Sequence, residues 1–302
     1  MKAHLSSHKC ESSKYMDYVL PETHFLEAWG DGVAMDGTVT ITQPIIEPIY
    51  EGRSALHVLD KLIGDTAIPL EIVKKTAELS GGGNWNEILA RGFYGAPAQA
   101  ATVSVTENLL GSLNTGQASG IELLILPDPM IGDGRYANNM WLQETPKPVT
   151  NLTWDNALLM SAATAKKLGI LAPNERKVAG VIPFYGKADM AEVTVGNQKL
   201  EVPVWVNLGQ ADDVVVLHMG YGRTVAGDFG TAKGEKMGGG FNANLLRPST
   251  NGHWVSGVEV KKTGKEYVLA NVQHHNTIDV SQVDKDREVI KMTTLKELEE
   301  GH

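Results

Sequence analysis

Apolar residues in the first third of the chain follow both the strand period and the helix period. The runs 15–20 and 38–41 predict short strands, the first of them buried and ended by Pro21. Three later runs predict helices that flank a small sheet, because their leucines and isoleucines recur at helical spacing. These helices are expected to begin after Ser54, at Pro69 and after Asn84, and the first presents Leu56, Leu59, Leu62 and Ile63 on one face.

The middle of the chain loses this regularity. Strands are predicted at 102–110 and 121–126, and the second ends in Leu-Pro-Asp-Pro. Residues 128–150 then show neither period, and an irregular connection of that length is usually functional or interfacial. Pro146 and Pro148 indicate a linker between two domains.

The second half of the chain is rich in strands. A short helix is predicted between Ser161 and Gly169, and Gly196-Asn197 is a strong signal for a two-residue β-hairpin. Thr263-Gly264-Lys265 is predicted to join the last two strands. So many short strands with one small helix favour a closed β-barrel over a sandwich. The strands are predicted at 177–184, 191–195, 199–206, 213–219, 254–261 and 267–273.

The predicted fold class is therefore α/β plus β, with an αβ domain followed by a barrel. We place the αβ domain at residues 1–148 and the barrel at 149–275. Residues 276–302 are expected to be a tail, with a loose helix after Thr294.

A glycine-rich stretch, 212–248, stands out within the barrel region. It begins as a strand and then carries glycine at positions 220, 222, 227, 230, 234, 238, 239 and 240. Glycine permits positive φ angles and lets backbone amides approach a ligand or another chain, although a mobile surface loop fits the composition equally well. The spacing is neither a phosphate-binding P-loop nor a Rossmann fingerprint. We expect the loop to be ordered by contacts that this chain does not itself complete.

Composition and charge narrow the possible functions. The 302 residues carry a net charge of −9, which argues against nucleic acid as a partner. No apolar run is long enough for a direct membrane span. The lone Cys10 excludes a cysteine-ligated iron–sulfur cluster made by this chain alone, and the histidine spacings predict no metal site. No nucleophile, acid or base constellation predicts a catalytic residue, so a free-standing hydrolase is disfavoured.

Several motifs, in this order, give the chain a resemblance to the molybdopterin oxidoreductase family. They are Tyr18-Val-Leu-Pro with Glu27 and Gly30, then GRYANNMWLQETPKPVT, TWDNA, GYGR and GFNANLLR. The resemblance implies that the first domain is a remnant of the family's central αβ domains. It implies that the second is a double-psi β-barrel of the molybdopterin dinucleotide-binding type. The branch that the chain resembles most is the molybdopterin-like iron–sulfur subunit of alternative complex III, a quinol-oxidising respiratory assembly.

The same resemblance implies two alternative functions. As a fragment or truncated homologue, the chain would be a non-catalytic scaffold that binds no cofactor alone and contacts other subunits of a membrane-associated respiratory complex. That complex would lie at the periplasmic face of the bacterial inner membrane. The alternative is a part of a true molybdenum oxidoreductase that binds molybdopterin guanine dinucleotide. The candidate cofactor-binding residues are then His218, Tyr221, Gly222, Arg223, Asn242 and Asn244.

Two residues of the irregular segment have competing interpretations. Arg135 could cap the loop's own carbonyls, anchor an interface or bind an anion. For Trp141 we prefer a core position over the domain junction to a stacking platform.

Overall fold

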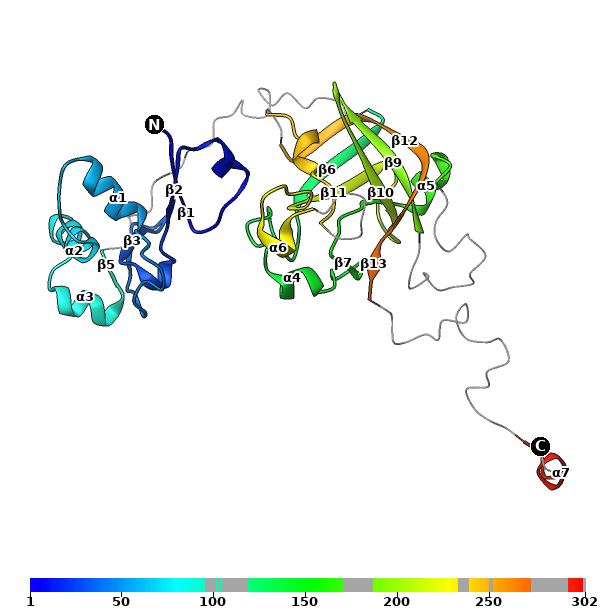
Figure 1. Cartoon of the computed structure of the whole chain (residues 1–302), viewed down its shortest axis with the longest axis horizontal. Helices are drawn as coiled ribbons and strands as arrows, with labels where there is room; N and C mark the ends of the chain where they lie inside the picture. Colours follow the sequence, from blue (N-terminus) through cyan, green and yellow to red (C-terminus); the bar gives the residue numbers. More distant parts are fainter. Residues whose placement is uncertain are drawn as a thin grey trace. The chain divides into compact units, whose positions relative to one another are not determined.

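The computed structural model describes residues 1–95, 102, 104, 119–170, 187–232, 239–249, 252–272 and 293–300. The chain divides into two compact units, Met1–Thr115 and Gly116–His302 (Figure 1). The division lies before residue 148 because β6, Ile121–Pro127, pairs within the barrel of the second unit. The strands predicted at 102–110 and 177–184 fall outside the described residues, apart from positions 102 and 104.

The described part of the first unit holds three α-helices, two short 3₁₀ helices and two small sheets. β3, β4 and β5 form an antiparallel sheet, and β1 pairs with β2 in parallel. Ser54 and Asn84 cap α1 and α3 as predicted, since their side-chain oxygens accept hydrogen bonds from the N–H groups of His57 and Asn86. The elements are β1 Ala3–Ser6, β2 Tyr18–Pro21, β3 Gly30–Val33, β4 Val39–Thr42, α1 Ala55–Leu62, α2 Pro69–Leu79, α3 Trp85–Arg91 and β5 Phe93–Tyr94.

One sequence expectation for this unit is wrong about burial. The strand before Pro21 is exposed along its whole length instead of buried. In α1 the leucine face stays exposed at Leu59, Leu62 and Ile63, whereas Asp60 is buried. The helical period located the helix correctly, but the described residues of this unit bury only a small cluster, centred on Ala77, Ile88 and Tyr94.

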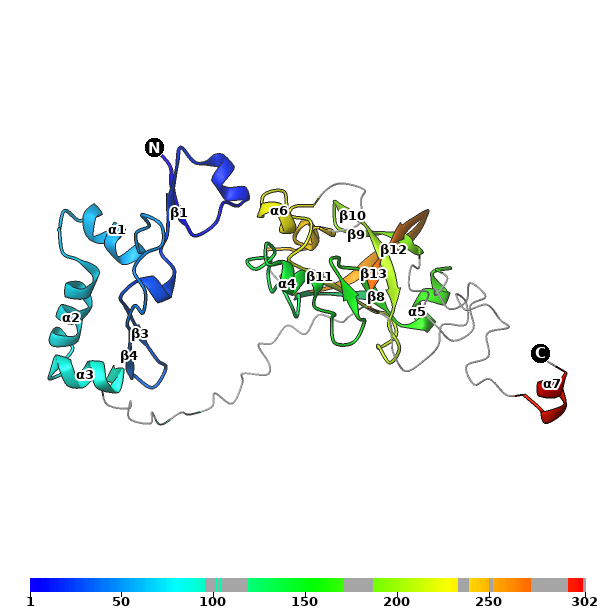
Figure 2. The ribbon, with the colours of Figure 1, turned by 60° about the horizontal axis from the view of Figure 1, so that its bottom comes forward.

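The second unit is a closed β-barrel. Among the described residues, the strands close in the order β10-β8-β11-β6-β12-β9, which is compatible with the expected double-psi barrel (Figures 1 and 2). β6 and β11 run parallel, and so do β8 and β10, whereas the β9–β10 hairpin is antiparallel. Besides β6, the barrel strands are β8 Leu158–Met160, β9 Lys187–Val195, β10 Gln198–Val206, β11 Val214–Met219 and β12 Trp254–Val268.

The barrel interior is filled by aliphatic side chains from every strand. Leu123, Leu158, Val193 and Leu217 have no more than 1% of their surface exposed, and Leu246 closes one end of the same cluster. The alternating burial along β11 matches a strand with one face toward the core. The apolar run that predicted this strand is therefore explained by the barrel core.

The hairpin and the short helix that the sequence predicted in the second unit are both confirmed. The β9–β10 hairpin turns at Gly196-Asn197, and α5, Ala162–Lys167, begins after Ser161, whose Oγ accepts a hydrogen bond from Thr164 N at 3.1 Å. The predicted break at residues 263–265 is wrong, because β12 continues through it against β9 with a register shift between Lys262 and Glu266. Gly264, at φ 79°, accommodates this irregularity instead of a turn.

The remaining elements of the second unit are not strands of the barrel wall. The helix predicted after Thr294 is present as α7, and no helix of the described residues is long and apolar enough to cross a membrane. These elements are α4 Met140–Glu144, the short pair β7 Leu152–Thr153 and β13 Ala270–Asn271, α6 Gly227–Gly230, the 3₁₀ helix η5 Ala243–Leu246 and α7 Leu295–Glu299.

Candidate functional site

The carboxyl ends of the parallel strands β6 and β11 meet at one end of the barrel. His218 and Met219 pair with Leu126 and Pro127, so Asp128 and the start of the glycine-rich stretch emerge at the same level. Asp128 is buried, and its Oδ1 accepts hydrogen bonds from the next turn, Met130 N at 2.9 Å and Ile131 N at 3.1 Å. The sheet register thus places a fixed carboxylate beside Tyr221.

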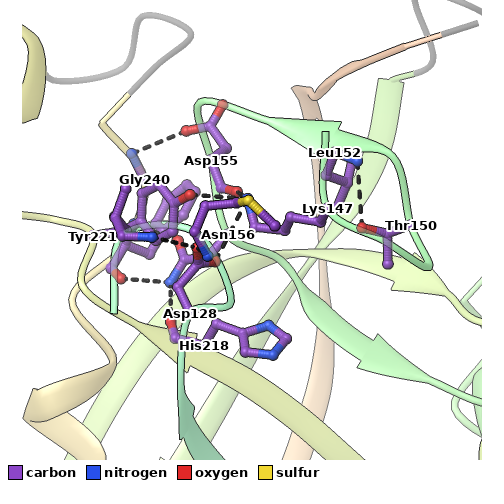
Figure 3. Close-up of polar contacts among 12 residues, drawn as sticks. Asp128, Lys147, Thr150, Leu152, Asp155, Asn156, His218, Tyr221 and Gly240 are labelled. Carbon is purple, nitrogen blue, oxygen red and sulfur yellow. Dashed lines mark hydrogen bonds and ion pairs between the residues drawn. The ribbon is translucent and has the colours of Figure 1, made fainter. Parts of the chain in front are cut away.

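Lys147 lies at the centre of this group (Figure 3). Its Nζ donates to the carbonyl oxygen of Asp155 at 2.9 Å and to the Tyr221 hydroxyl at 2.8 Å. Asp128 Oδ2 is 3.6 Å from the same nitrogen, which is an ion-pair distance and not a hydrogen bond. Only 5% of the Lys147 surface is exposed. A buried cation therefore joins three separate segments of the chain.

Burial controls the electrostatics of the group. Desolvation lowers the pKa of Lys147, and the carboxylates of Asp128 and Asp155 oppose that shift. Burial also raises the pKa of Tyr221, with the same two acids adding to the effect, so the phenol stays neutral. At His218, burial lowers the pKa, Asp128 raises it and Lys147 lowers it. The arrangement is that of a compensated buried charge.

Asp155 and Asn156 bind the later part of the glycine-rich stretch, at Gly240 and Phe241, to the residues around Lys147. Asp155 Oδ1 accepts from Gly240 N at 2.9 Å, and both of its carboxylate oxygens are 3.3 Å from the Tyr267 hydroxyl. Asn156 Nδ2 donates to the carbonyls of His218 and Phe241 at 2.6 and 2.8 Å, and its Oδ1 accepts from Phe241 N (Figure 3). Asn156 therefore bridges the end of β11 and the residues before η5.

The residue before this pair has an unusual backbone. Trp154 has φ 64°, a left-handed conformation that a bulky side chain rarely adopts, and its carbonyl accepts from Gly239 N at 3.1 Å. Such strain persists where the surroundings fix the backbone. The buried contacts of Asp155 and Asn156 on one side and Gly239 on the other provide that constraint.

The described glycines of the stretch are points of close packing within this chain. A Cβ at Gly222 would collide with the backbone nitrogen of Asn242, and one at Gly240 would lie 2.6 Å from Asn156 Oδ1. Near α6, a Cβ at Gly230 would lie 2.7 Å from the carbonyl carbon of Ala137. Residues 220–232 and 239–247 therefore make close contacts within the chain, and the expected contacts from outside stay a prediction; positions 234 and 238 lie outside the described residues.

The six candidate cofactor-binding residues make contacts within the chain at or next to this end of the barrel. His218 and Tyr221 border the Lys147 group, and Gly222 packs on Asn242. Arg223 Nη1 donates to the Gly134 carbonyl at 2.7 Å. Asn244 N donates to Asn242 Oδ1 at 3.1 Å, and Asn244 Oδ1 accepts from Arg247 Nη1 at 3.1 Å.

Sequence reasoning missed the residues that organise the site, which are Asp128, Lys147, Asp155 and Asn156. Lys147 was assigned to a linker because prolines flank it on both sides. An available signal was the irregular stretch itself, because a long connection without periodicity is often fixed by specific polar contacts. Among the described residues, no three His, Cys, Asp or Glu side chains lie close enough to hold a metal ion.

The structure bears on the competing interpretations of Arg135 and Trp141. Arg135 forms an exposed ion pair with Asp133 at 2.9 Å, which holds the pKa of that carboxyl at about 2. Trp141 is not a core residue, because 77% of its surface is exposed on α4. The irregular segment is thus anchored by buried Lys147 and Gln143 while its aromatic side chains face outward.

The lowered pKa of His218 leads to a pH prediction. The folded state binds a proton at this site less readily than the unfolded state, whose pKa is near 6.5. The contribution of neutral His218 to stability is thus complete above that value and is lost as the pH falls below it. The free energy of unfolding should fall between pH 7 and pH 5, and less steeply in His218→Gln. Urea titrations at several pH values would measure this, with His8→Gln as an exposed control; parallel curves for wild type and His218→Gln would contradict it.

Neither a protein-family model nor a curated protein sequence matches the chain. Among solved structures, the chain is similar to acetylene hydratase from Pelobacter acetylenicus, with a TM-score of 0.56 and 13% sequence identity. The match covers 85% of this chain but 39% of that one, so this chain spans less than half the length of acetylene hydratase. At this identity the similarity shows a shared fold alone. The family that the sequence motifs resemble stays a prediction beyond this shared fold.

Proposed function

We propose that this chain is a non-catalytic scaffold within a molybdopterin-oxidoreductase-like subunit of a quinol-oxidising respiratory complex, of the alternative complex III type. The observation that carries the proposal is that the buried polar side chains at this end of the barrel bind one another. The cation Lys147 is compensated by Asp128 and Asp155, and its N–H groups bind Asp155 and Tyr221. A dinucleotide phosphate would have to compete with these buried contacts.

The candidate residues fit a molybdopterin dinucleotide poorly. Arg223, the natural phosphate ligand among them, donates to the carbonyls of Gly134 and Val225 at 2.7 and 3.3 Å. Asn242 uses its Oδ1 to cap η5 through Asn244 N at 3.1 Å. The Tyr221 hydroxyl is buried and accepts from Lys147. These contacts stabilise the loop itself, which favours a structural role for the barrel over cofactor binding.

Exposed aromatic side chains on the barrel unit favour a scaffold with protein partners. Tyr136, Trp141 and Phe229 expose 55, 77 and 43% of their surfaces. Phe229 N donates to Asn138 Oδ1 at 3.2 Å, so α6 is fixed on the segment that carries the other two. Exposed aromatic residues on ordered segments are typical of protein interfaces. The expected partners are other subunits at the periplasmic face of the bacterial inner membrane.

The cofactor content of the purified chain tests the scaffold role. The chain should be produced in a host that makes molybdopterin guanine dinucleotide, alongside a molybdenum enzyme as a positive control. We expect molybdenum by elemental analysis, and the fluorescence of oxidised pterin, at far below one equivalent. Near-stoichiometric molybdenum and pterin, lost in Arg223→Ala, would overturn the proposal in favour of a dinucleotide-binding domain.

Purification from native membranes tests the respiratory assignment. A tagged chain, solubilised in mild detergent, should co-purify with an assembly that oxidises a quinol with an artificial electron acceptor. The same fraction prepared from a strain with an unrelated tagged protein is the control. Recovery of the chain without quinol-oxidising activity would contradict the respiratory assignment and leave the fold unaffected.

A further inference from the structure

Two neighbouring segments of the first unit expose an unusual number of large apolar side chains. Segments 18–27 and 45–53 lie against each other, because the Leu26 carbonyl accepts from Ile45 N at 2.9 Å and the Pro21 carbonyl accepts from Arg53 N at 3.0 Å. Glu27 Oε1 adds a third link by accepting from Ile49 N at 3.0 Å. The exposed fractions are Tyr18 57%, Leu20 39%, Phe25 64%, Ile45 73%, Ile46 45%, Ile49 71% and Tyr50 79%.

These segments also concentrate negative charge. Together the two segments contain four glutamates, Glu22, Glu27, Glu47 and Glu51, and one arginine, Arg53, a net charge of −3. Glu47 and Glu51 are exposed among the apolar residues. An exposed apolar surface within an acidic segment is uncommon in a protein that functions alone.

The combination of apolar and acidic groups selects among possible occupants. An anionic membrane surface would be repelled by this charge. A second copy of the same surface would bring like charges together across a twofold axis, which is unfavourable. A basic segment would complement the carboxylates and cover the apolar side chains.

We propose that segments 18–27 and 45–53 form a docking surface for a basic, apolar segment of a partner protein. The backbone links between the segments hold the surface in place before binding. Glu27 stabilises the conformation of this surface, because its two carboxylate oxygens accept hydrogen bonds from the backbone N–H groups of Ile49 and His24. The exposed glutamates contribute through charge. The inference rests on the first unit and does not depend on the function proposed above.

Fluorescence anisotropy with synthetic peptides and the full chain tests this proposal. The probe is a labelled peptide of alternating lysine and leucine. Two comparison peptides replace its lysines by glutamate or its leucines by serine. We expect the lysine–leucine peptide to bind at least about tenfold more tightly than either, because binding needs both charge and apolar contact. Added salt should weaken binding without abolishing it.

Matched variants locate the binding surface. Tyr50→Ser and Ile49→Ser should each weaken binding by about tenfold, whereas Leu79→Ser, an equally exposed residue of α2, should leave it unchanged. The pair Glu47→Gln and Glu51→Gln should weaken binding and reduce its salt dependence, with Glu78→Gln as the control. Circular dichroism confirms that each variant is folded.

Four results would overturn the proposal. They are equal binding of the glutamate peptide, equal loss of binding in Leu79→Ser, and tighter binding to vesicles of anionic lipid than to the peptide. The fourth is a dimer in light scattering that Tyr50→Ser dissociates, which would identify a second copy as the occupant.

Discussion

Replacing Lys147 by methionine is expected to destabilise the barrel by about 3–5 kcal/mol, because removal of one partner leaves a buried opposite charge uncompensated. Asp128 Oδ2 would lose the cation 3.6 Å away, and the Asp155 carbonyl and Tyr221 hydroxyl would lose a donor. Methionine keeps most of the side-chain volume, so the effect measures the charge and its hydrogen bonds. Urea denaturation, with amide exchange at Leu217 as a probe of the barrel core, measures the change.

An exposed ion pair of the same barrel provides the control. Lys199 lies 2.7 Å from Glu192 with 62% of its side chain exposed, so Lys199→Met should change stability by less than about 1 kcal/mol. Adding Asp128→Asn to Lys147→Met should recover part of the loss, since the uncompensated charge is then removed. If Lys147→Met and Lys199→Met lowered the free energy of unfolding by similar amounts, the buried pair would contribute no more to stability than the exposed one.

The contrast between these two lysines explains why the sequence predicted the barrel but not the site. Binary pattern and turn chemistry act locally, so the strand at 214–219, the hairpin at Gly196-Asn197 and the Ser161 cap could all be read from neighbouring residues. Lys147 is buried by partners that are distant in sequence. Tyr221, one of them, lies 74 positions away, and no periodicity reports such a contact.

The domain boundary was misplaced for the same reason. A proline-flanked segment is typical of a linker, and residues 146–148 match that pattern. The strand before it, β6, completes the barrel by pairing with β11 and β12, both much later in the chain. Residues 146–148 therefore connect two parts of one domain, and the buried contacts of Lys147 hold them in position. The exposed leucine face of α1 is a different case, because an amphipathic pattern indicates an apolar face but not what covers it.

Replacing Gly222 by alanine is expected to destabilise the barrel more than the backbone conformation alone would explain. Gly222 has φ 67°, and an added Cβ would meet the backbone nitrogen of Asn242. Backbone atoms cannot rotate away as a flexible side chain can, so the residues before η5 would have to move. That movement would strain the bonds of Asn156 to Phe241, at 2.8 Å each. We expect a loss of at least about 3 kcal/mol, the strain of a left-handed residue plus this steric term.

Gly169 separates the two contributions, because it has the same φ of 67° with no atom within 4 Å of an added Cβ. Gly169→Ala therefore carries only the conformational strain, about 1–2 kcal/mol. If Gly222→Ala were no worse than Gly169→Ala in urea denaturation, the close approach to Asn242 would not be a packing constraint. If it is worse, amide exchange at Phe241 should accelerate with it, because that amide is held by Asn156 Oδ1. The glycine at 222 would then be required by close contact between two segments of this chain.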